Sequence, residues 1–503
     1  MTAHLLTVIV ISAVLTGCGP RRTKQGSSPS TDGQSTVGAD SEAGSDDGPD
    51  VHRTRPTSES RAIDGRFFGY NAASIVQPVN VELMFDPALT TELAKFPVDL
   101  IRIPSGTAAQ WLDWRTGRFI ASPDSPFVGV SAERRPTLMS DWQSWVERSG
   151  ATPVWDLNVL NSDLQDQIAM LEEAERLGMP VEFIELGNEL WDPRSIYPDR
   201  FGSGGDYARA MNEWIPALQE RFPTARIAVS GANLADEVFT AALGPRFNNW
   251  NHDVVSTITN ADAIAIHPYW TLPNKTPPGS DINATLTSGL DHWRAFETTT
   301  LDQLPKGLEV WLTEWNQGGH FVTSGTQVWA QALSVVAVAI EQLLDPRVTM
   351  SLIHNIVDGT SNPHDIGVST VFPSFTNGHD GTPRLARTAL GHALPILFSA
   401  VPSGSRVRRL VVDGVERVGD HPGVSAVLIS GKRPGALLVN LTAAAVRVAT
   451  PSTLGRDAEF KAVSAQTDAQ PGWVATDSVK QTSGSSASTT LLPPYSVTYI
   501  SGG

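Results

Sequence analysis

Between residues 61 and 401, short apolar segments alternate with longer amphipathic ones. The short segments are rich in β-branched and aromatic residues and are bounded by Gly, Pro, Asn or Asp, which is typical of buried strands. The longer segments repeat apolar residues every three or four positions, as one face of a helix does. Strands are predicted at 66–71, 98–104, 152–159, 181–189, 225–233, 261–270, 308–316 and 348–358.

Amphipathic helices are predicted at 162–178, 206–222 and 328–344. The first of them should begin at the capping residue Ser162 and end at Gly178. Eight strands alternating with helices favour an α/β fold, a (β/α)8 TIM barrel with loop insertions, over residues 61–401. A doubly wound sheet is the competing α/β fold, but no glycine-rich phosphate loop follows the first strand to favour it.

The pattern changes after residue 401. Segments such as "GVSAVLISG", "PGALLVNLT" and "LLPPYSVTYISGG" are short, rich in β-forming residues and separated by Gly, Pro and Ser. No helix is predicted beyond the segment 384–401. Residues 402–503 are therefore predicted to form an all-β sandwich domain.

The N-terminus carries an apolar run, "LLTVIVISAVLTGC", that is too short to span a bilayer comfortably but has the length of a signal-peptide core. It ends at Cys18, the only cysteine, so no intramolecular disulfide can form. Leu-Thr-Gly-Cys resembles the bacterial lipobox, although "MTAH" before the run has no Lys or Arg. The resemblance implies that residues 1–18 are a lipoprotein signal peptide and that Cys18 is lipidated.

Residues 19–60 are rich in Ser, Gly, Asp and Thr and nearly free of large apolar residues. Such a segment buries too little surface to offset its ordering entropy, so a disordered tether is predicted. Together with the lipobox it predicts an exported protein that is lipid-anchored to the bacterial cell envelope. The membrane would then be reached through the N-terminal anchor.

The overall charge limits the partners. The formal net charge is −16 and the isoelectric point is near 5.1. Nucleic-acid binding needs clustered Lys and Arg, so no nucleic-acid partner is expected. Hydrophobic residues make up 41% of the chain, enough for a sizeable core.

Polar residues gather at the predicted carboxyl ends of the strands, where a barrel of this type places its active site. Alternation along a strand relates them to their neighbours. If Glu314 points inward, Leu312 and Val310 should do so too, whereas Thr313 and Trp311 should face the helices. In the same way His267 should share its face with Ala265 and Ala263, and Glu189 with Glu185.

Asn188 lies next to Glu189 and can reach the same pocket only if the strand twists or bulges, which Gly187 would permit. Two glutamates on different strand ends, Glu189 and Glu314, suggest paired-carboxylate catalysis, as in glycosidic hydrolysis. The alternative for each glutamate alone is a solvated strand end or half of an ion pair. Several tryptophans at or beyond strand ends suggest stacking platforms for sugars, with ordinary packing as the alternative: Trp111, Trp114, Trp155, Trp191, Trp270 and Trp315.

The motifs "IELGNEL", "AIHPYW" and "LTEWN", in this order, resemble the retaining glycoside hydrolases that have (β/α)8 barrels and glutamates after strands four and seven. The closest resemblance is to α-L-arabinofuranosidase-like enzymes, followed by the heparanase and β-glucuronidase group. "IRIPSGTAAQW" is similar to their Arg-x-Pro-Gly-Gly-Thr stretch, with Ser105 in place of the first glycine. The resemblance covers about residues 66–401, and the C-terminal domain resembles their accessory β-domain.

This resemblance implies Glu189 as acid/base and Glu314 as nucleophile of a double displacement on a carbohydrate substrate, without metal or other cofactor. Asn188 would bind the sugar 2-hydroxyl, and Arg102 and Tyr269 would keep the nucleophile ionised. The other predicted substrate-binding residues are His267, Trp270, Trp315 and Asn158, and Glu185 is predicted to be a structural ion-pair partner.

Other functions remain open. A β-glucuronidase-, heparanase- or β-xylosidase-like specificity would fit the same motifs on plant- or matrix-type glycans. A metal-dependent barrel hydrolase commonly carries His-x-His on its first strand, where this chain has "FFGYN". A non-catalytic glycan-binding lipoprotein is the third alternative, although both glutamates are present.

Overall fold

The computed structural model describes residues 51–502 with internal gaps. The residues left out are 1–50, 64, 73–86, 88–90, 92–97, 105, 128–134, 195, 272–280, 318–327, 356, 361–371, 377–382, 386–387, 469–478 and 503. Residues 1–18 with Cys18, and the tether up to residue 50, therefore lie outside the described residues.

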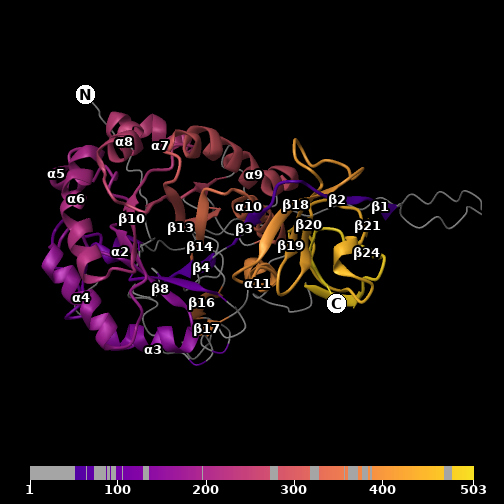
Figure 1. Cartoon of the computed structure of the whole chain (residues 1–503), viewed down its shortest axis with the longest axis horizontal. Helices are drawn as coiled ribbons and strands as arrows, with labels where there is room; N and C mark the ends of the chain where they lie inside the picture. Colours follow the sequence, from indigo (N-terminus) through magenta and orange to yellow (C-terminus); the bar gives the residue numbers. More distant parts are fainter. Residues whose placement is uncertain are drawn as a thin grey trace, which may run out of the picture.

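Eight parallel strands form a closed barrel, as predicted (Figure 1). The strands lie in the order of the sequence, and the pairing of the sixth with the seventh closes the barrel. β12 (Tyr269–Trp270) is a short additional strand that pairs in parallel with the end of β13, the seventh barrel strand. The barrel strands are β4 (Phe68–Asn71), β5 (Leu100–Ile103), β8 (Thr152–Asp156), β9 (Phe183–Leu186), β10 (Arg226–Ser230), β11 (Ala263–Ala265), β13 (Glu309–Gln317) and β14 (Val348–Ile353).

Helices cover the outside of the barrel (Figure 1). The cap of α4 differs from the prediction: Asp163 accepts the Asp166 amide hydrogen bond, while the Ser162 hydroxyl bonds the Asp166 carboxylate instead. The helices are α2 (Gly106–Ala109), α3 (Met139–Ser149), α4 (Leu164–Arg176), α5 (Ile196–Arg200), α6 (Gly204–Arg221), α7 (Glu237–Ala242), α8 (Gly244–Thr257), α9 (Ile282–Thr299), α10 (Trp329–Leu344) and α11 (Ala389–Ala400).

The barrel interior below the polar strand ends is filled by a small apolar cluster to which most of the strands contribute. Ala263 and Ala265 belong to it, as predicted from His267. Trp311 also belongs to it, so the predicted alternation along β13 is wrong. Leu312 and Val310 pack instead in the larger apolar layer that the helices share.

The C-terminal domain is a β-sandwich, as predicted. Its small sheet holds β1 (Val51–His52), β21 (Val446–Ala449) and β24 (Thr489–Leu492), and an apolar cluster lies between the two sheets. The other face of the large sheet contacts α10 and α11, so barrel and sandwich share one apolar core. The large sheet holds β2 (Thr54–Pro56), β3 (Arg61–Ala62), β18 (Arg406–Val412), β19 (Val424–Ser430), β20 (Gly435–Asn440), β22 (Glu459–Ser464), β23 (Lys480–Ser485) and β25 (Ser496–Ser501).

Shorter strands lie in the loops. β6 (Leu112–Asp113) pairs with β7 (Arg118–Phe119), and a separate three-stranded sheet holds β15 (Val357–Thr360), β16 (Phe372–Thr376) and β17 (Pro383–Leu385).

The N-terminal strands correct the predicted extent of the tether. Residues 51–60 were assigned to it, but β1 pairs with β21, and β2 pairs with β18. The segment contributes backbone hydrogen bonds rather than a large apolar face, so its composition alone reads as disordered. The chain thus enters the barrel only after passing through the C-terminal sandwich.

Arg61 joins the N-terminal strands to the barrel. Its guanidinium donates to the backbone oxygens of Gln342, Leu343, Asp345 and Val348, at the end of α10 and the start of β14. The carbonyl groups at a helix C-terminus have no partner within the helix, so a cation that binds them is stabilising.

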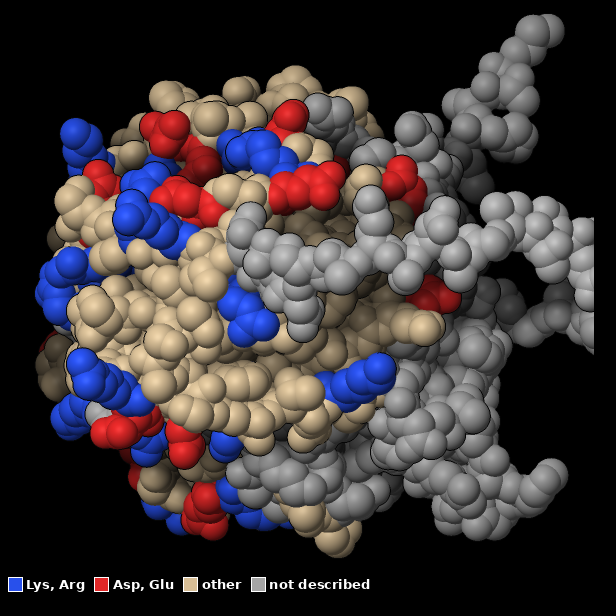
Figure 2. Space-filling model, turned by 90° about the vertical axis from the view of Figure 1, so that its right-hand side faces the viewer, with Lys and Arg blue, Asp and Glu red and all other residues tan. Residues whose placement is uncertain are grey.

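Charges of both signs are interspersed on the molecular face shown in Figure 2. Within the described part of that face, Lys and Arg do not merge into a basic stripe of the kind that follows a phosphate backbone. None of the helices described is long and apolar enough to cross a membrane.

We expect Arg61→Gln to lower the free energy of unfolding by about 2–3 kcal/mol, because several charge-assisted hydrogen bonds are lost at once. Urea denaturation measures this. Arg55→Gln, which removes an exposed ion pair with Asp413, is the control and should stay close to the wild-type midpoint. Equal urea midpoints for the two variants would contradict a stabilising role of the Arg61 hydrogen bonds.

Candidate active site

Arg102 lies at the centre of the polar end of the barrel and has no exposed surface. Its Nε and Nη2 donate to the two carboxylate oxygens of Glu185, each at 2.7 Å. Its Nη1 donates to Glu314 Oε1 at 2.5 Å, and Nη2 also donates to Asn188 Oδ1 at 3.0 Å. The guanidinium therefore connects three strands, and Glu185 is the ion-pair partner that the sequence predicted.

The charges around Arg102 do not balance. Asp156 Oδ2 lies 3.0 Å from Nη2, so three carboxylates face one cation. Burial, and then repulsion from Glu185 and Glu314, raise the pKa of Asp156 well above its usual range, against the attraction of Arg102. The raised pKa favours the protonated form of Asp156, which lessens the net negative charge of the cluster.

The end of β9 turns sharply to present two adjacent side chains. Gly187 has φ +87°, and a Cβ there would come within 2.5 Å of Val159 Cγ2. Glu189 itself has φ +48°, a left-handed conformation that few residues other than glycine adopt. This turn brings Asn188 and Glu189 to the same site, as the glycine predicted.

A bulge in β13 likewise brings two adjacent side chains, Thr313 and Glu314, to the site. Leu312 pairs with Ser351 and Trp315 with Ile353, so three steps along β13 match two along β14. Thr313, which the sequence assigned to the helix side, donates to Glu185 Oε1 at 3.2 Å. Sequence reasoning missed this residue because strict alternation does not foresee an extra one.

His267 lies between the two glutamates. Its Nδ1 is 3.0 Å from Glu189 Oε1 and 3.9 Å from Glu314 Oε2, and its Nε2 is 3.1 Å from Thr313 Oγ1. Because the Thr313 hydroxyl donates to Glu185, the histidine Nε2 is the donor to Thr313. Burial alone would lower the pKa of His267, but the charges of Glu314 and Glu189 outweigh it and raise the pKa.

The two glutamates differ in acidity. Burial raises the pKa of Glu189, partly offset by the His267 hydrogen bond. Burial acts in the same direction on Glu314, but the positive charges of His267, His354 and Arg102, with the Tyr269 hydrogen bond, hold its pKa at about 2. Tyr269 Oη donates to Glu314 Oε2 at 2.9 Å. The site thus pairs a carboxyl group whose pKa is raised, Glu189, with one whose pKa is lowered, Glu314.

Glu189, His267 and Glu314 could also approach a cation, since one ligand atom from each lies within 4.8 Å of the others. A metal there would have to replace the His267–Glu189 hydrogen bond. It would also lie beside Glu314, whose two oxygens already bind Arg102 and Tyr269. The three side chains are therefore close enough together to bind a metal ion, but their oxygen and nitrogen atoms already bind other groups of the protein.

Trp270 and Trp315 are buried in the apolar packing, which corrects their predicted role as sugar platforms. Trp315 has no exposed surface and Trp270 only 3%. Their rings stack on each other with centroids 6.4 Å apart, and Trp270 also stacks on His292. Bulky indoles beside α9 and α10 gain more from this packing than from exposure.

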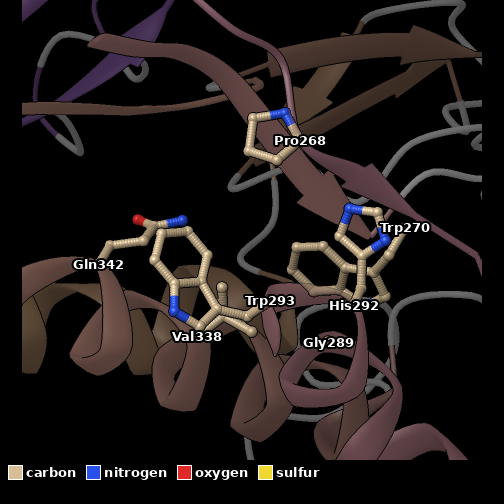
Figure 3. Close-up of a pocket in the computed structure, with 7 residues that line it drawn as sticks. All are labelled: Pro268, Trp270, Gly289, His292, Trp293, Val338 and Gln342. Carbon is tan, nitrogen blue, oxygen red and sulfur yellow. The ribbon is translucent and has the colours of Figure 1, made fainter. Parts of the chain in front are cut away.

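Trp270 lines a small cavity between the barrel and α9 and α10 (Figure 3). The cavity has no room for a water molecule, so it is a packing defect rather than a substrate pocket. The residues that line it are Pro268, Trp270, Gly289, His292, Trp293, Val338 and Gln342.

Asn158 acts locally in the structure. Its Oδ1 accepts a hydrogen bond from the backbone N–H of Asn161 at 2.9 Å, and its own backbone N–H donates to Gln167 Oε1. These contacts hold the turn after β8, and none of its described contacts reaches Glu189 or Glu314. The predicted substrate contact therefore gains no support from these contacts.

Known proteins resemble this chain in structure but not in sequence. No protein-family model and no curated protein matches it. AbfB, a family 51 α-L-arabinofuranosidase from Bifidobacterium longum, is similar with a TM-score of 0.68 at 14% identity, over 91% of this chain and 100% of that one. The α-L-arabinofuranosidase from Thermotoga maritima, in its arabinose complex, gives a TM-score of 0.66 at 14% identity, over 90% and 99%.

A structure described as an endo-β1,6-glucanase is also similar, with a TM-score of 0.53 at 9% identity, over 90% of this chain and 94% of that one. At such low identity these similarities show a common fold, a (β/α)8 barrel with a C-terminal β-sandwich. The resemblance to arabinofuranosidase-like barrels in the sequence motifs is thus matched by the architecture.

We expect Arg102→Met to lower the free energy of unfolding by about 3–5 kcal/mol at pH 7, because buried carboxylates lose their cation. Without the attraction of Arg102 the pKa of Asp156 rises further above its unfolded value, so the folded variant binds extra protons. Its stability should then increase as the pH falls from 7 to 5. In the wild type, the contribution of Glu314, with its pKa at about 2, is complete above its ordinary value of 4.5 and does not change in this window.

Urea denaturation at pH 5 and pH 7 measures both effects. Arg176→Met is the matched control, because Arg176 pairs with Glu173 on the exposed face of α4 and its loss should leave both midpoints unchanged. A pH-independent loss in Arg102→Met would contradict the charge imbalance described above.

Proposed function

We propose that this protein is a glycoside hydrolase that cleaves α-L-arabinofuranosides with retention of configuration. The observation that carries the proposal is the pair Glu189 and Glu314. Their nearest oxygens lie within 4.8 Å, and their pKa values are shifted in opposite directions. Retaining glycosidases hold their two carboxyl groups about 5–5.5 Å apart, whereas inverting enzymes leave about 6.5–9.5 Å for a water molecule.

In the first step Glu314 attacks the anomeric carbon while Glu189 protonates the leaving oxygen. Glu314 suits attack because Arg102 and Tyr269 each bind one of its oxygens and keep it ionised. Glu189 suits proton donation because burial raises its pKa. The glycosidic bond breaks and an ester between the sugar and Glu314 forms.

In the second step Glu189, now ionised, takes a proton from water, which attacks the anomeric carbon and releases Glu314. His267 hydrogen-bonds Glu189 at 3.0 Å and stabilises this ionised state. Asn188 accepts a hydrogen bond from Arg102 through Oδ1, so its Nδ2 amino group is the part left to donate to a substrate hydroxyl.

The choice of arabinofuranosides rests on the motifs in the sequence and on the similarity in structure to two α-L-arabinofuranosidases. Because the same barrel also occurs in an endo-β1,6-glucanase, the sugar has to be found by experiment. A set of 4-nitrophenyl glycosides, comprising the α-L-arabinofuranoside, β-D-glucuronide, β-D-xyloside and β-D-glucoside, tests it. Turnover of another member alone would replace the substrate but keep the reaction class.

A metal-dependent hydrolase is the second candidate, and the geometry of Glu189, His267 and Glu314 is the observation in its favour. The two candidates differ in one measurement. Exhaustive treatment with a chelator should leave the activity of the proposed retaining enzyme unchanged, whereas a metal-dependent enzyme would lose it and regain it with added zinc or manganese.

The roles of the two glutamates predict different behaviour of their variants. Glu314→Ala should lose activity on every substrate, since no covalent intermediate can form. Glu189→Ala should still form the glycosyl-enzyme from 4-nitrophenyl α-L-arabinofuranoside, whose leaving group needs no proton, and then stall. Azide should restore its turnover by about 10²-fold or more and give an arabinosyl azide of retained configuration.

Product configuration from NMR decides the assignment. An inverted azide product from Glu314→Ala would exchange the two roles. Gln143→Ala, a substitution on the exposed face of α3, is the control and should match the wild type. Full activity in both glutamate variants would refute the proposed site.

We also propose that the protein is exported and anchored by a lipid on Cys18, which the lipobox-like Leu-Thr-Gly-Cys and the polar segment after it support. In bacteria, Cys18→Ser should move the protein from the membrane fraction to the soluble fraction or block its maturation. Intact-mass analysis checks the mature N-terminus. A product that retains residues 1–17 without lipid would rule the anchor out.

A further inference from the structure

The backbone that carries Glu189 is held in a conformation that it would not adopt alone. Glu189 has φ +48°, and the Asp192 amide donates to the Glu189 carbonyl at 2.9 Å, which closes a tight turn. A left-handed residue other than glycine costs of the order of 1–3 kcal/mol and persists only where its surroundings impose it. The turn therefore needs an external constraint.

Arg246, from the first turns of α8, supplies such a constraint. Its Nη2 donates to Leu190 O at 2.7 Å, and its Nη1 donates to Trp191 O at 2.5 Å and to Asp192 O at 3.0 Å. These are the three carbonyl groups that follow Glu189 in the chain. A fourth bond, from Nη2 to Phe201 O at 2.8 Å, ties the same guanidinium to the end of α5.

Other side chains fix the neighbouring atoms. The Leu190 amide donates to Ser230 Oγ at 3.3 Å, and Trp191 Nε1 donates to Gly231 O at 3.1 Å. The guanidinium of Arg246 lies 4.9 Å from the Trp250 ring, whose Nε1 in turn donates to Ser230 O. The turn after Glu189 is thus attached to the end of β10 through several bonds, and Arg246 binds three consecutive carbonyls of the turn.

We propose that Arg246 is a positioning residue for Glu189: by binding the carbonyls of residues 190–192 it holds the strained turn that aims the acid/base at the leaving oxygen. This inference rests on the proposed function. Arg246 touches no reacting atom, so its loss should act on proton transfer and not on attack by Glu314. A planar guanidinium with several N–H donors suits this task, which a lysine ammonium performs only in part.

The test uses Arg246→Gln and Arg246→Lys in the full chain with two probes, 4-nitrophenyl and phenyl α-L-arabinofuranoside. The phenyl leaving group depends more on protonation by Glu189. A misplacement of about 1 Å costs of the order of 10²-fold. We expect kcat/KM of Arg246→Gln to fall about ten- to hundredfold more on the phenyl than on the 4-nitrophenyl substrate, with Arg246→Lys between it and the wild type.

Azide should also raise the turnover of Arg246→Gln on the 4-nitrophenyl substrate, because deglycosylation needs the same misplaced base. The matched control is Arg61→Gln, which removes another guanidinium that binds four backbone carbonyls, at the end of α10 and the start of β14. It should lose stability but keep the wild-type ratio between the two substrates and show no azide effect. Equal losses of Arg246→Gln on both substrates, without azide rescue, would overturn the proposal.

Hydrogen exchange of the peptide 186–194 provides a readout that does not depend on activity. It should speed up in Arg246→Gln and stay unchanged in Arg61→Gln. If the wild type cleaves neither probe, the proposed arabinofuranosidase activity fails. Hydrogen exchange alone then tests whether Arg246 holds the turn after Glu189. Unchanged exchange in Arg246→Gln would refute it.

Discussion

The polar end of the barrel depends on one buried guanidinium. Arg102 binds Glu185 through two bonds and reaches Glu314 and Asn188 with its remaining donors. Because Glu185 and Asn188 belong to β9 and its end whereas Glu314 belongs to β13, the ion pairs fix the relative positions of the two strand ends that carry Glu189 and Glu314. Removal of two charges from water is costly, so a buried arrangement of this kind serves geometry and acidity more than stability.

Much of this arrangement could be predicted from the sequence. Strand ends of parallel barrels meet at one face, so Glu189, His267 and Glu314 could be brought together from their positions alone. The side of the strand on which Thr313 and Trp311 lie could not be predicted. A bulge in β13 inserts one residue and inverts the alternation of side chains. Nothing in "LTEWN" distinguishes a regular strand from a bulged one.

Two other features escaped prediction for different reasons. Trp270 and Trp315 follow strand ends, as a sugar platform would, but indole rings are large enough to fill the layer under α9 and α10, where the structure buries them. The strands β1 and β2 lie in a polar segment and owe their order to backbone hydrogen bonds with β21 and β18. The partners of such strands are distant in the chain, so local composition carries no sign of them.

The pairing of β2 with β18 also sets a time constraint on biosynthesis. Thr57 and Arg409, which are bonded in the folded protein, are 352 residues apart in the chain. At a synthesis rate of about 5–20 residues per second, β2 waits roughly 18–70 s for its partner strand to be made. During that interval its backbone groups are unpaired and open to association with other chains. The polar, charged composition of "VHRTRPTSESR" lowers the risk of such association, because it keeps the unpaired strand solvated until the sandwich can form around it.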